Sequence, residues 1–145
     1  MNLQTTFCGV EFKNPLVLAS GVLGVTGASL KFCVENGAGG VTTKSIWRTG
    51  HEGHPNPVMI ANEHFMLNAV GLPDAGMEKA YIEIGEYMKN KPAPLIANIV
   101  EARIEDFGEV AEKVSALNPD IIEVNISCPN VEDEFGKPFS CSRVD

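Results

Sequence analysis

A single cysteine stands between two asparagines directly after an apolar stretch. Residues 124–132 read V-N-I-S-C-P-N-V-E, which places Cys128 before a proline, with Asn125 on one side and Asn130 on the other. A thiolate can act as a base, and carboxamides bind ligands that offer both hydrogen-bond donors and acceptors. The segment therefore has two interpretations: a base with its amide partners at the mouth of a pocket, or a strand end followed by a Pro-Asn turn.

Strand-like and helix-like segments alternate along the chain. Apolar runs at 16–19, 39–44, 93–99 and 121–125 predict strands, and segments with helical spacing at 28–35, 77–88 and 104–117 predict helices. Residues 3–7 and 10–12 flank a Cys8-Gly9 turn and predict a short antiparallel hairpin, while 45–73 read as a long irregular stretch. This alternation predicts an α/β fold with right-handed βαβ units and a parallel sheet whose strands are buried on both faces.

Each of the four predicted parallel strands ends in a polar side chain. These are Ser20, Lys44, Asn98 and Asn125. Ligands of parallel α/β folds bind at the carboxyl ends of the strands, so four separate segments are expected to deliver one polar group each to the same face.

The composition limits the classes of partner. The chain has 145 residues and a formal net charge of -8, which argues against nucleic acid and against an anionic membrane surface. No apolar run approaches the ~20 residues that a membrane span needs, and no secretion signal is visible. The four cysteines form no C-x-x-C pair, so a reduced, cytoplasmic protein is expected. His51 and His54 lie in a Gly/Pro-rich loop without a metal-binding pattern.

Five blocks, taken in order, resemble the dihydroorotate dehydrogenases. They are N-P-L-V-L-A-S-G at 14–21, T-K-S at 43–45, N-A-V-G-L-P at 68–73, A-N-I at 97–99 and N-I-S-C-P-N-V at 125–131. The class 1 enzymes are the better match, because they use cysteine as the base where the membrane-associated class has serine. The resemblance extends from about residue 3 to residue 131.

The resemblance implies a (β/α)8 TIM barrel that binds FMN at its C-terminal face. Such barrels usually need about 250 residues. Residues 1–145 are therefore expected to form a partial FMN-binding domain, the N-terminal half of the barrel with about four βα units and the short N-terminal β-hairpin. This fragment is expected to bind FMN weakly and to be inactive alone.

The implied reaction is the oxidation of dihydroorotate to orotate in de novo pyrimidine biosynthesis. Cys128 would remove a proton from C5 while hydride passes from C6 to N5 of the flavin, and Lys44 would contact both flavin and substrate. The implied substrate contacts are Lys44, Asn68, Ala69, Val70, Gly71, Leu72, Asn125 and Asn130. The implied flavin contacts are Ala19, Ser20, Gly21, Lys44, Ser45, Asn98 and Asn125. Trp47, Arg48 and His51 have no implied role.

Partners and alternatives follow from the same resemblance. Within class 1, the NAD-linked type 1B is favoured, which pairs with an FAD and iron–sulfur electron-transfer subunit; the other type is a homodimer that reduces fumarate. Open strand edges of a half-barrel would favour a homo-oligomer. Two alternatives stay open. One is a dihydropyrimidine dehydrogenase-type flavoenzyme, which shares a similar S-C-P stretch, and the other is a non-catalytic half-barrel that acts only by association.

Overall fold

The computed structural model describes residues 2–128. Asn130, which the resemblance implies as a substrate contact, lies outside this range. The described elements are β1 (Thr5–Phe7), β2 (Val10–Phe12), β3 (Val17–Leu18), the short 3-10 helix η1 (Val22–Gly24), α1 (Gly27–Glu35), β4 (Gly40–Thr42), β5 (Met59–Ala61), β6 (Met66–Asn68), α2 (Met77–Met88), β7 (Leu95–Ile99), α3 (Ile104–Ser115) and β8 (Ile121–Val124).

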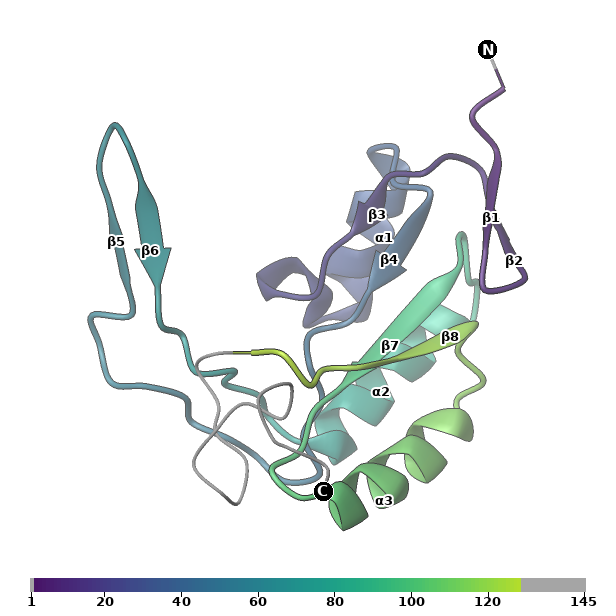
Figure 1. The fold of residues 1–145 in the computed structure, drawn as a ribbon. Coiled ribbons are helices and arrows are strands. Elements are labelled where there is room, and N and C mark those ends of the chain that lie inside the picture. Colours follow the sequence, from purple (N-terminus) through teal and green to yellow (C-terminus); the bar gives the residue numbers. More distant parts are fainter. Residues whose placement is uncertain (1, 129–145) are drawn as a thin grey trace, which may run out of the picture.

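A four-stranded parallel sheet organises the molecule. Its strand order is β3-β4-β7-β8, so each strand lies beside the next one that the βα alternation supplies. Helices α1, α2 and α3 lie together on one side of this sheet, as Figure 1 shows. The mixed α/β fold with a parallel sheet that the sequence predicts is therefore confirmed.

The core lies between the sheet and this helical layer. Alternate residues of β7, Leu95, Ala97 and Ile99, are buried in it, and α3 contributes Val110 and Val114, which are fully buried. At about 25 cal/mol per Å² of buried apolar surface, a buried valine, leucine or isoleucine side chain stabilises the fold by roughly 1.5–3 kcal/mol. The other members of the core cluster are Leu30, Val34, Val41, Ile46, Met77, Ile84, Tyr87 and Ala93.

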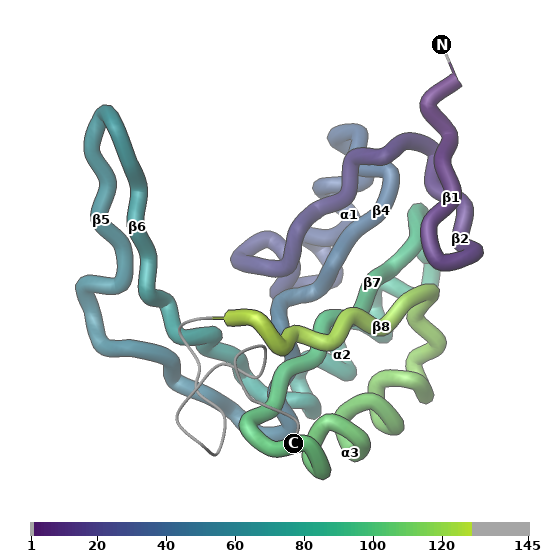
Figure 2. The backbone as a smooth tube through the Cα atoms, viewed as in Figure 1, coloured from purple at the N-terminus to yellow at the C-terminus, as the bar shows by residue number. Residues whose placement is uncertain are grey.

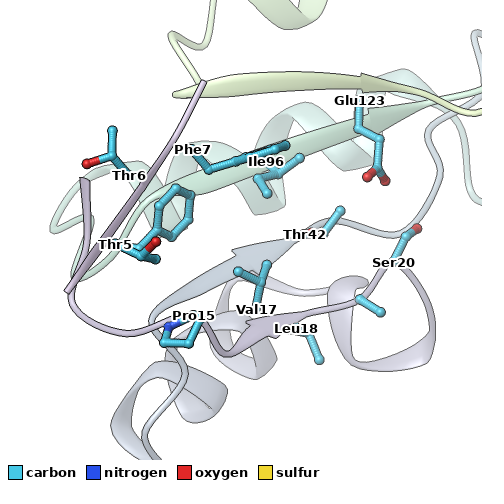
Figure 3. A pocket seen from close by; sticks show the side chains of 12 residues that line it. Thr5, Thr6, Phe7, Pro15, Val17, Leu18, Ser20, Thr42, Ile96 and Glu123 are labelled. Carbon is cyan, nitrogen blue, oxygen red and sulfur yellow. The ribbon is translucent and has the colours of Figure 1, made fainter. Parts of the chain in front are cut away.

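The opposite face of the sheet is open. A cavity of about 490 Å³ lies against it, and the β1–β2 hairpin, which pairs antiparallel, contributes to its wall. Figure 3 shows Val17, Thr42, Ile96 and Glu123 directed into this space from the four parallel strands. The prediction that all strands are buried on both faces is therefore wrong for the outer strands, because Val17 of β3 is 40% exposed and β8 is no more than half-buried.

Helix α1 begins at a well-defined cap. The Thr26 hydroxyl accepts a hydrogen bond from the Ser29 backbone N–H at 3.1 Å, and the Ser29 hydroxyl accepts one from the Thr26 N–H at 3.2 Å. The first helical residue, Gly27, donates to the Glu83 carboxylate of α2 at 2.9 Å. This reciprocal capping fixes the position at which the chain leaves η1 and enters the helical layer.

The structure differs from the sequence prediction between residues 45 and 73. Strands β5 and β6 form an antiparallel hairpin there, which projects away from the sheet and helices, as the tube in Figure 2 shows. Its large apolar side chains, including Ile60 and Met66, are exposed. Phe32 of α1 is also exposed.

Candidate active site

Three polar residues that follow three different strands, β3, β4 and β8, meet at the carboxyl rim of the sheet. The Ser45 hydroxyl lies 3.4 Å from the Ser20 hydroxyl, and it accepts a hydrogen bond of 3.4 Å from the Asn125 carboxamide. Backbone hydrogen bonds hold the segments that carry them, since Ile46 N–H donates to the Asn98 carbonyl and Asn125 N–H donates to the Ile99 carbonyl, both at 2.9 Å. Of the four strand-end residues predicted to converge, Ser20 and Asn125 are brought together here, each through Ser45.

Asn98 lies on the inner face of β7 and is only 3% exposed. Its backbone N–H donates to the Thr43 hydroxyl at 3.0 Å, and its side-chain NH₂ donates to the Glu123 carboxylate on β8. The side-chain oxygen of Asn98 is buried and has no hydrogen-bond partner among residues 2–128. A buried acceptor without a partner costs roughly 1–3 kcal/mol, which a ligand that donates a hydrogen bond would recover.

Glu123 is the residue of this group that the sequence analysis missed. It stands opposite Asn98 in the register of β7 and β8. The signal was present in the sequence, because a carboxylate interrupts the otherwise apolar run I-I-E-V of a strand expected to be buried. In Figure 3 the Glu123 and Ser20 side chains both lie at the same end of the cavity.

Lys44 and Cys128 lie near each other at this rim. Burial lowers the pKa of the Lys44 ammonium from its ordinary value, and the charges of Asp74 and the Cys128 thiolate act against that shift. The Lys44 backbone N–H donates to the Gly24 carbonyl at 2.9 Å, which fixes the start of its side chain. Cys128 is half-buried and is a free thiol. The arrangement places a cation beside a group that can carry a negative charge as a base.

The predicted substrate loop, residues 68–72, follows β6. Asn68 and Ala69 are exposed, Val70 and Leu72 are half-buried, and Gly71 is buried. No hydrogen bond within the described range joins Asn68 to the rim residues. The loop is instead connected to the rim through the segment that follows Lys44.

The rim groups are suited to a planar heteroaromatic ring. Hydroxyls, carboxamides and an ammonium together offer donors and acceptors, and the unpaired Asn98 oxygen adds a buried acceptor for a ring N–H. Ala19 and Ser20 line the adjoining cavity, and Gly21 directly follows them in the chain. The residues present thus fit a flavin ring system.

The described residues contain neither a metal-binding cluster nor a membrane-spanning helix. Among residues 2–128, no group of three or more His, Cys, Asp or Glu side chains could hold a metal ion. No helix in this range is both long enough and apolar enough to cross a membrane.

A parallel sheet with polar side chains gathered at the carboxyl ends of its strands is typical of α/β proteins that bind a ligand at this edge. The comparison with known families then gives the family, because the profile of the dihydroorotate dehydrogenases matches residues 2–140. The chain belongs to the dihydroorotate dehydrogenase family, as its five sequence blocks predict.

Relatives with established names agree with this assignment. The chain is 45% identical over 131 residues to a Methanosarcina mazei protein and 42% identical over 134 residues to one from Methanocaldococcus jannaschii, both named dihydroorotate dehydrogenase B (NAD(+)), catalytic subunit. These matches cover 90% of this chain but only 42% and 43% of the relatives. The chain therefore spans about two fifths of the length of the relatives that it matches.

A solved structure supports the fold. The dihydroorotate dehydrogenase of Eimeria tenella, crystallised with ferulenol, superimposes with a TM-score of 0.76 at 24% identity. The match covers 90% of this chain and 38% of that one.

Proposed function

We propose that this chain forms the N-terminal part of a dihydroorotate dehydrogenase that oxidises dihydroorotate to orotate in pyrimidine biosynthesis. The observation that carries the proposal is the proximity of Lys44 and Cys128 at the carboxyl rim of the parallel sheet, where the thiolate contributes to the pKa of the ammonium. Family membership and 45% identity to a dihydroorotate dehydrogenase B catalytic subunit support the same reaction.

The four-stranded sheet corresponds in this proposal to the first half of a (β/α)8 barrel, with residues 1–145 as a partial FMN-binding domain. Each outer strand, β3 and β8, has a neighbour on one side only within the described part of the chain. The inner face carries a cavity of about 490 Å³. Four further βα units would pair with both edges and fill this space.

FMN is the cofactor that we assign to the rim, and when bound it supplies the acceptor for the substrate hydride. Ser20, Ser45 and Asn125 would hold the ring by hydrogen bonds, and the unpaired Asn98 oxygen would accept one from a ring N–H. Ala19 and Gly21 would let the backbone approach the ring. The Lys44 ammonium would stabilise negative charge that develops at the ring edge.

The chain's own chemical step is proton removal. The Cys128 thiolate accepts the proton from C5 of dihydroorotate, while the Lys44 ammonium holds the substrate and balances the negative charge. The substrate ring is held by carboxamides, and residues 68–72 supply further contacts. The contact set is Lys44, Asn68, Ala69, Val70, Gly71, Leu72, Asn125 and Asn130.

The names of the relatives support NAD(+) as the electron acceptor. Because those proteins are called NAD(+)-linked catalytic subunits, we propose a partner subunit that carries FAD and an iron–sulfur cluster. A homo-oligomer of the catalytic chain and a cytoplasmic location complete the proposal, which agrees with the free state of Cys8, Cys33 and Cys128.

The test uses the complete, FMN-loaded protein and stopped-flow measurement of flavin reduction. Dihydroorotate is expected to reduce the flavin and dihydrouracil is not. Cys128→Ser is expected to slow reduction near pH 7 by at least about 100-fold, because a hydroxyl is a far weaker acid than a thiol. Cys8→Ser, the same change on an exposed turn, is the control and should react at the normal rate. Normal reduction by the Cys128 variant, or a preference for dihydrouracil, would refute the assignment.

A further inference from the structure

The segment at 47–54 runs beside the residues that precede α2 and is joined to them by hydrogen bonds. His51 and Asp74 exchange two backbone hydrogen bonds of 2.9 Å, and the His54 N–H donates to the Val70 carbonyl at 3.1 Å. The Asp74 carboxylate accepts from the Trp47 N–H at 3.3 Å. We call residues 47–54 the brace, because they hydrogen-bond to Val70 and Leu72 of the predicted substrate loop and to Asp74 beyond it.

Trp47 makes the most specific contact of the brace. Its indole N–H donates to the Leu72 carbonyl at 2.9 Å, and its ring stacks on His51 with centroids 4.5 Å apart and an interplanar angle of 12°. The side chain is 6% exposed, so this hydrogen bond is protected from water. A buried, directional donor therefore ends on the last residue of the loop.

The loop backbone needs such support. Leu72 has φ of 50° and Gly71 has φ of 74°, so two consecutive residues lie in the left-handed region. For leucine this conformation is unfavourable and persists only where surrounding contacts enforce it. A Cβ on Gly71 would come within 2.7 Å of the His54 backbone nitrogen, so the brace approaches the loop as closely as glycine allows.

This backbone shape leaves two neighbouring N–H groups, those of Gly71 and Leu72, available as hydrogen-bond donors. Neither the Gly71 nor the Leu72 backbone N–H donates a hydrogen bond to another residue in the range 2–128. Two neighbouring backbone N–H groups without a partner in this range can both donate to an anionic oxygen such as that of a carboxylate. If the loop had to adopt this shape only on binding, the ordering would reduce the affinity for the ligand.

We propose that Trp47 is a positioning residue, which holds the loop at 68–72 in its ligand-binding shape before substrate arrives. The inference rests on the proposed function, which supplies the carboxylate of dihydroorotate or orotate as the anionic group. Trp47 itself touches no substrate in this account; it acts through the Leu72 carbonyl.

The experiment compares Trp47→Phe with Tyr87→Phe in the complete, FMN-loaded protein. Phenylalanine keeps an aromatic ring next to His51 and removes the N–H donor together with one ring of the indole. Tyr87→Phe is the matched control, because it removes a buried side-chain hydrogen bond to the Ala93 carbonyl, of 2.8 Å, that has no connection with the loop. Orotate affinity is read from the change in flavin absorbance, and hydrogen exchange reports the amides of residues 68–73.

Trp47→Phe is expected to weaken orotate binding about three- to tenfold, as loss of one hydrogen bond allows, and to accelerate exchange at Gly71 and Leu72. The KM for dihydroorotate should rise while kcat and FMN content stay normal. The Tyr87 control should change none of these quantities. Unchanged loop exchange in Trp47→Phe overturns the inference whatever the ligand does, and so does unchanged orotate affinity where the wild type binds orotate.

A second variant acts on the brace without altering Trp47. Gly53 has φ of 76°, and a Cβ there would lie 2.5 Å from the Val70 carbonyl oxygen. Gly53→Ala is therefore expected to displace the loop and to weaken orotate binding in the same way, and it decides the question if Trp47→Phe does not fold. Wild-type protein that binds FMN but not orotate would refute the proposed function. The hydrogen-exchange measurements would still test whether Trp47 holds the loop.

Discussion

Asn98 and Glu123 are joined side chain to side chain across neighbouring parallel strands. The carboxylate accepts from the Asn98 NH₂ group, so the carboxamide is oriented with its oxygen as the remaining, unpaired polar atom. A carboxylate has no hydrogen to donate and cannot bond that oxygen instead. Glu123 thereby decides which of the two ends of Asn98 is offered to a ligand.

We expect Glu123→Leu to weaken FMN binding by the complete protein by at least about fivefold, because the Asn98 NH₂ group would lose its acceptor and the carboxamide could rotate. Glu123→Gln keeps an acceptor oxygen and should bind FMN nearly normally. Flavin fluorescence quenching on titration of the apoprotein measures both affinities. Glu112→Leu, on an exposed position of α3, is the control and should bind as the wild type does. Equal FMN affinity for the leucine and glutamine variants at 123 would contradict the role given to Glu123.

Burial of the Lys44 ammonium is expected to reduce the stability of the folded protein. Because burial lowers its pKa below the ordinary 10.5, the unfolded chain binds more protons than the folded one between these two values. Wild-type stability should therefore rise with pH across that window. Lys44→Met removes the cost of burying the ammonium, so it should raise the melting temperature at pH 7 and abolish reduction of the flavin by dihydroorotate.

The pH dependence of this stability gain separates the explanation from a simple packing effect. The advantage of Lys44→Met should shrink as the pH approaches 10.5, and calorimetry of the complete protein at several pH values measures it. Lys79→Met, at an exposed position of α2, should show no such trend. A melting temperature for Lys44→Met that is below wild type at every pH would show that attraction to Asp74 outweighs burial.

Glu101 is expected to make stability depend on pH in the opposite direction to Lys44. Its carboxylate is buried and accepts from the Arg48 backbone N–H at 2.6 Å, and burial raises its pKa above the ordinary 4.5, with Asp106 adding to the shift. The folded protein therefore binds more protons than the unfolded chain above pH 4.5, and stability falls as the pH rises through that window. Glu101→Gln keeps the acceptor and should stabilise the protein at pH 7 but not below pH 4.5.

Glu101→Ala provides the contrasting case. It removes the acceptor of the Arg48 N–H and should destabilise the protein by about 1–3 kcal/mol. Denaturant unfolding at pH 4 and pH 7 distinguishes the two variants. Glu112→Gln, an exposed acid outside the first turn of α3, should change stability by less than about 0.5 kcal/mol at both pH values. A glutamine variant that is equally stable relative to wild type at both pH values would disprove the linkage.

Local pattern was sufficient for the parallel sheet and the helices. The spacing predicts a helix over 77–88, and α2 occupies those residues, because a helix that covers a sheet must bury one stripe of its surface. The strands are shorter than predicted; β3 contains only Val17–Leu18 of the expected 16–19. Apolar runs report burial, whereas strand pairing depends on neighbours from distant parts of the chain.

Two kinds of feature escaped prediction: a local hairpin, and contacts between residues far apart in sequence. The β5–β6 hairpin lies in a stretch whose prolines and glycines suggest irregular structure, and its exposed apolar side chains give no amphipathic signal. Likewise, Trp47 contacts a carbonyl 25 positions later. No local spacing encodes such a contact, and the roles of Cys128 and the rim residues came from resemblance and stay predictions.

Gly24 is expected to control the position of Lys44. A Cβ there would lie 2.5 Å from the Lys44 backbone nitrogen and 2.6 Å from the Thr42 carbonyl oxygen, so backbone would have to move. The Gly24 carbonyl also accepts the Lys44 N–H. We expect Gly24→Ala to destabilise the protein by more than about 1 kcal/mol and to reduce FMN content, measured by calorimetry and flavin absorbance.

Gly85→Ala and Gly108→Ala carry the same added methyl group on helices where nothing lies within 4 Å. These controls should gain about 0.5–1 kcal/mol and keep normal FMN content, because alanine favours the helix over glycine. A Gly24 variant that behaves like these controls would show that the start of the Lys44 side chain is not fixed by η1.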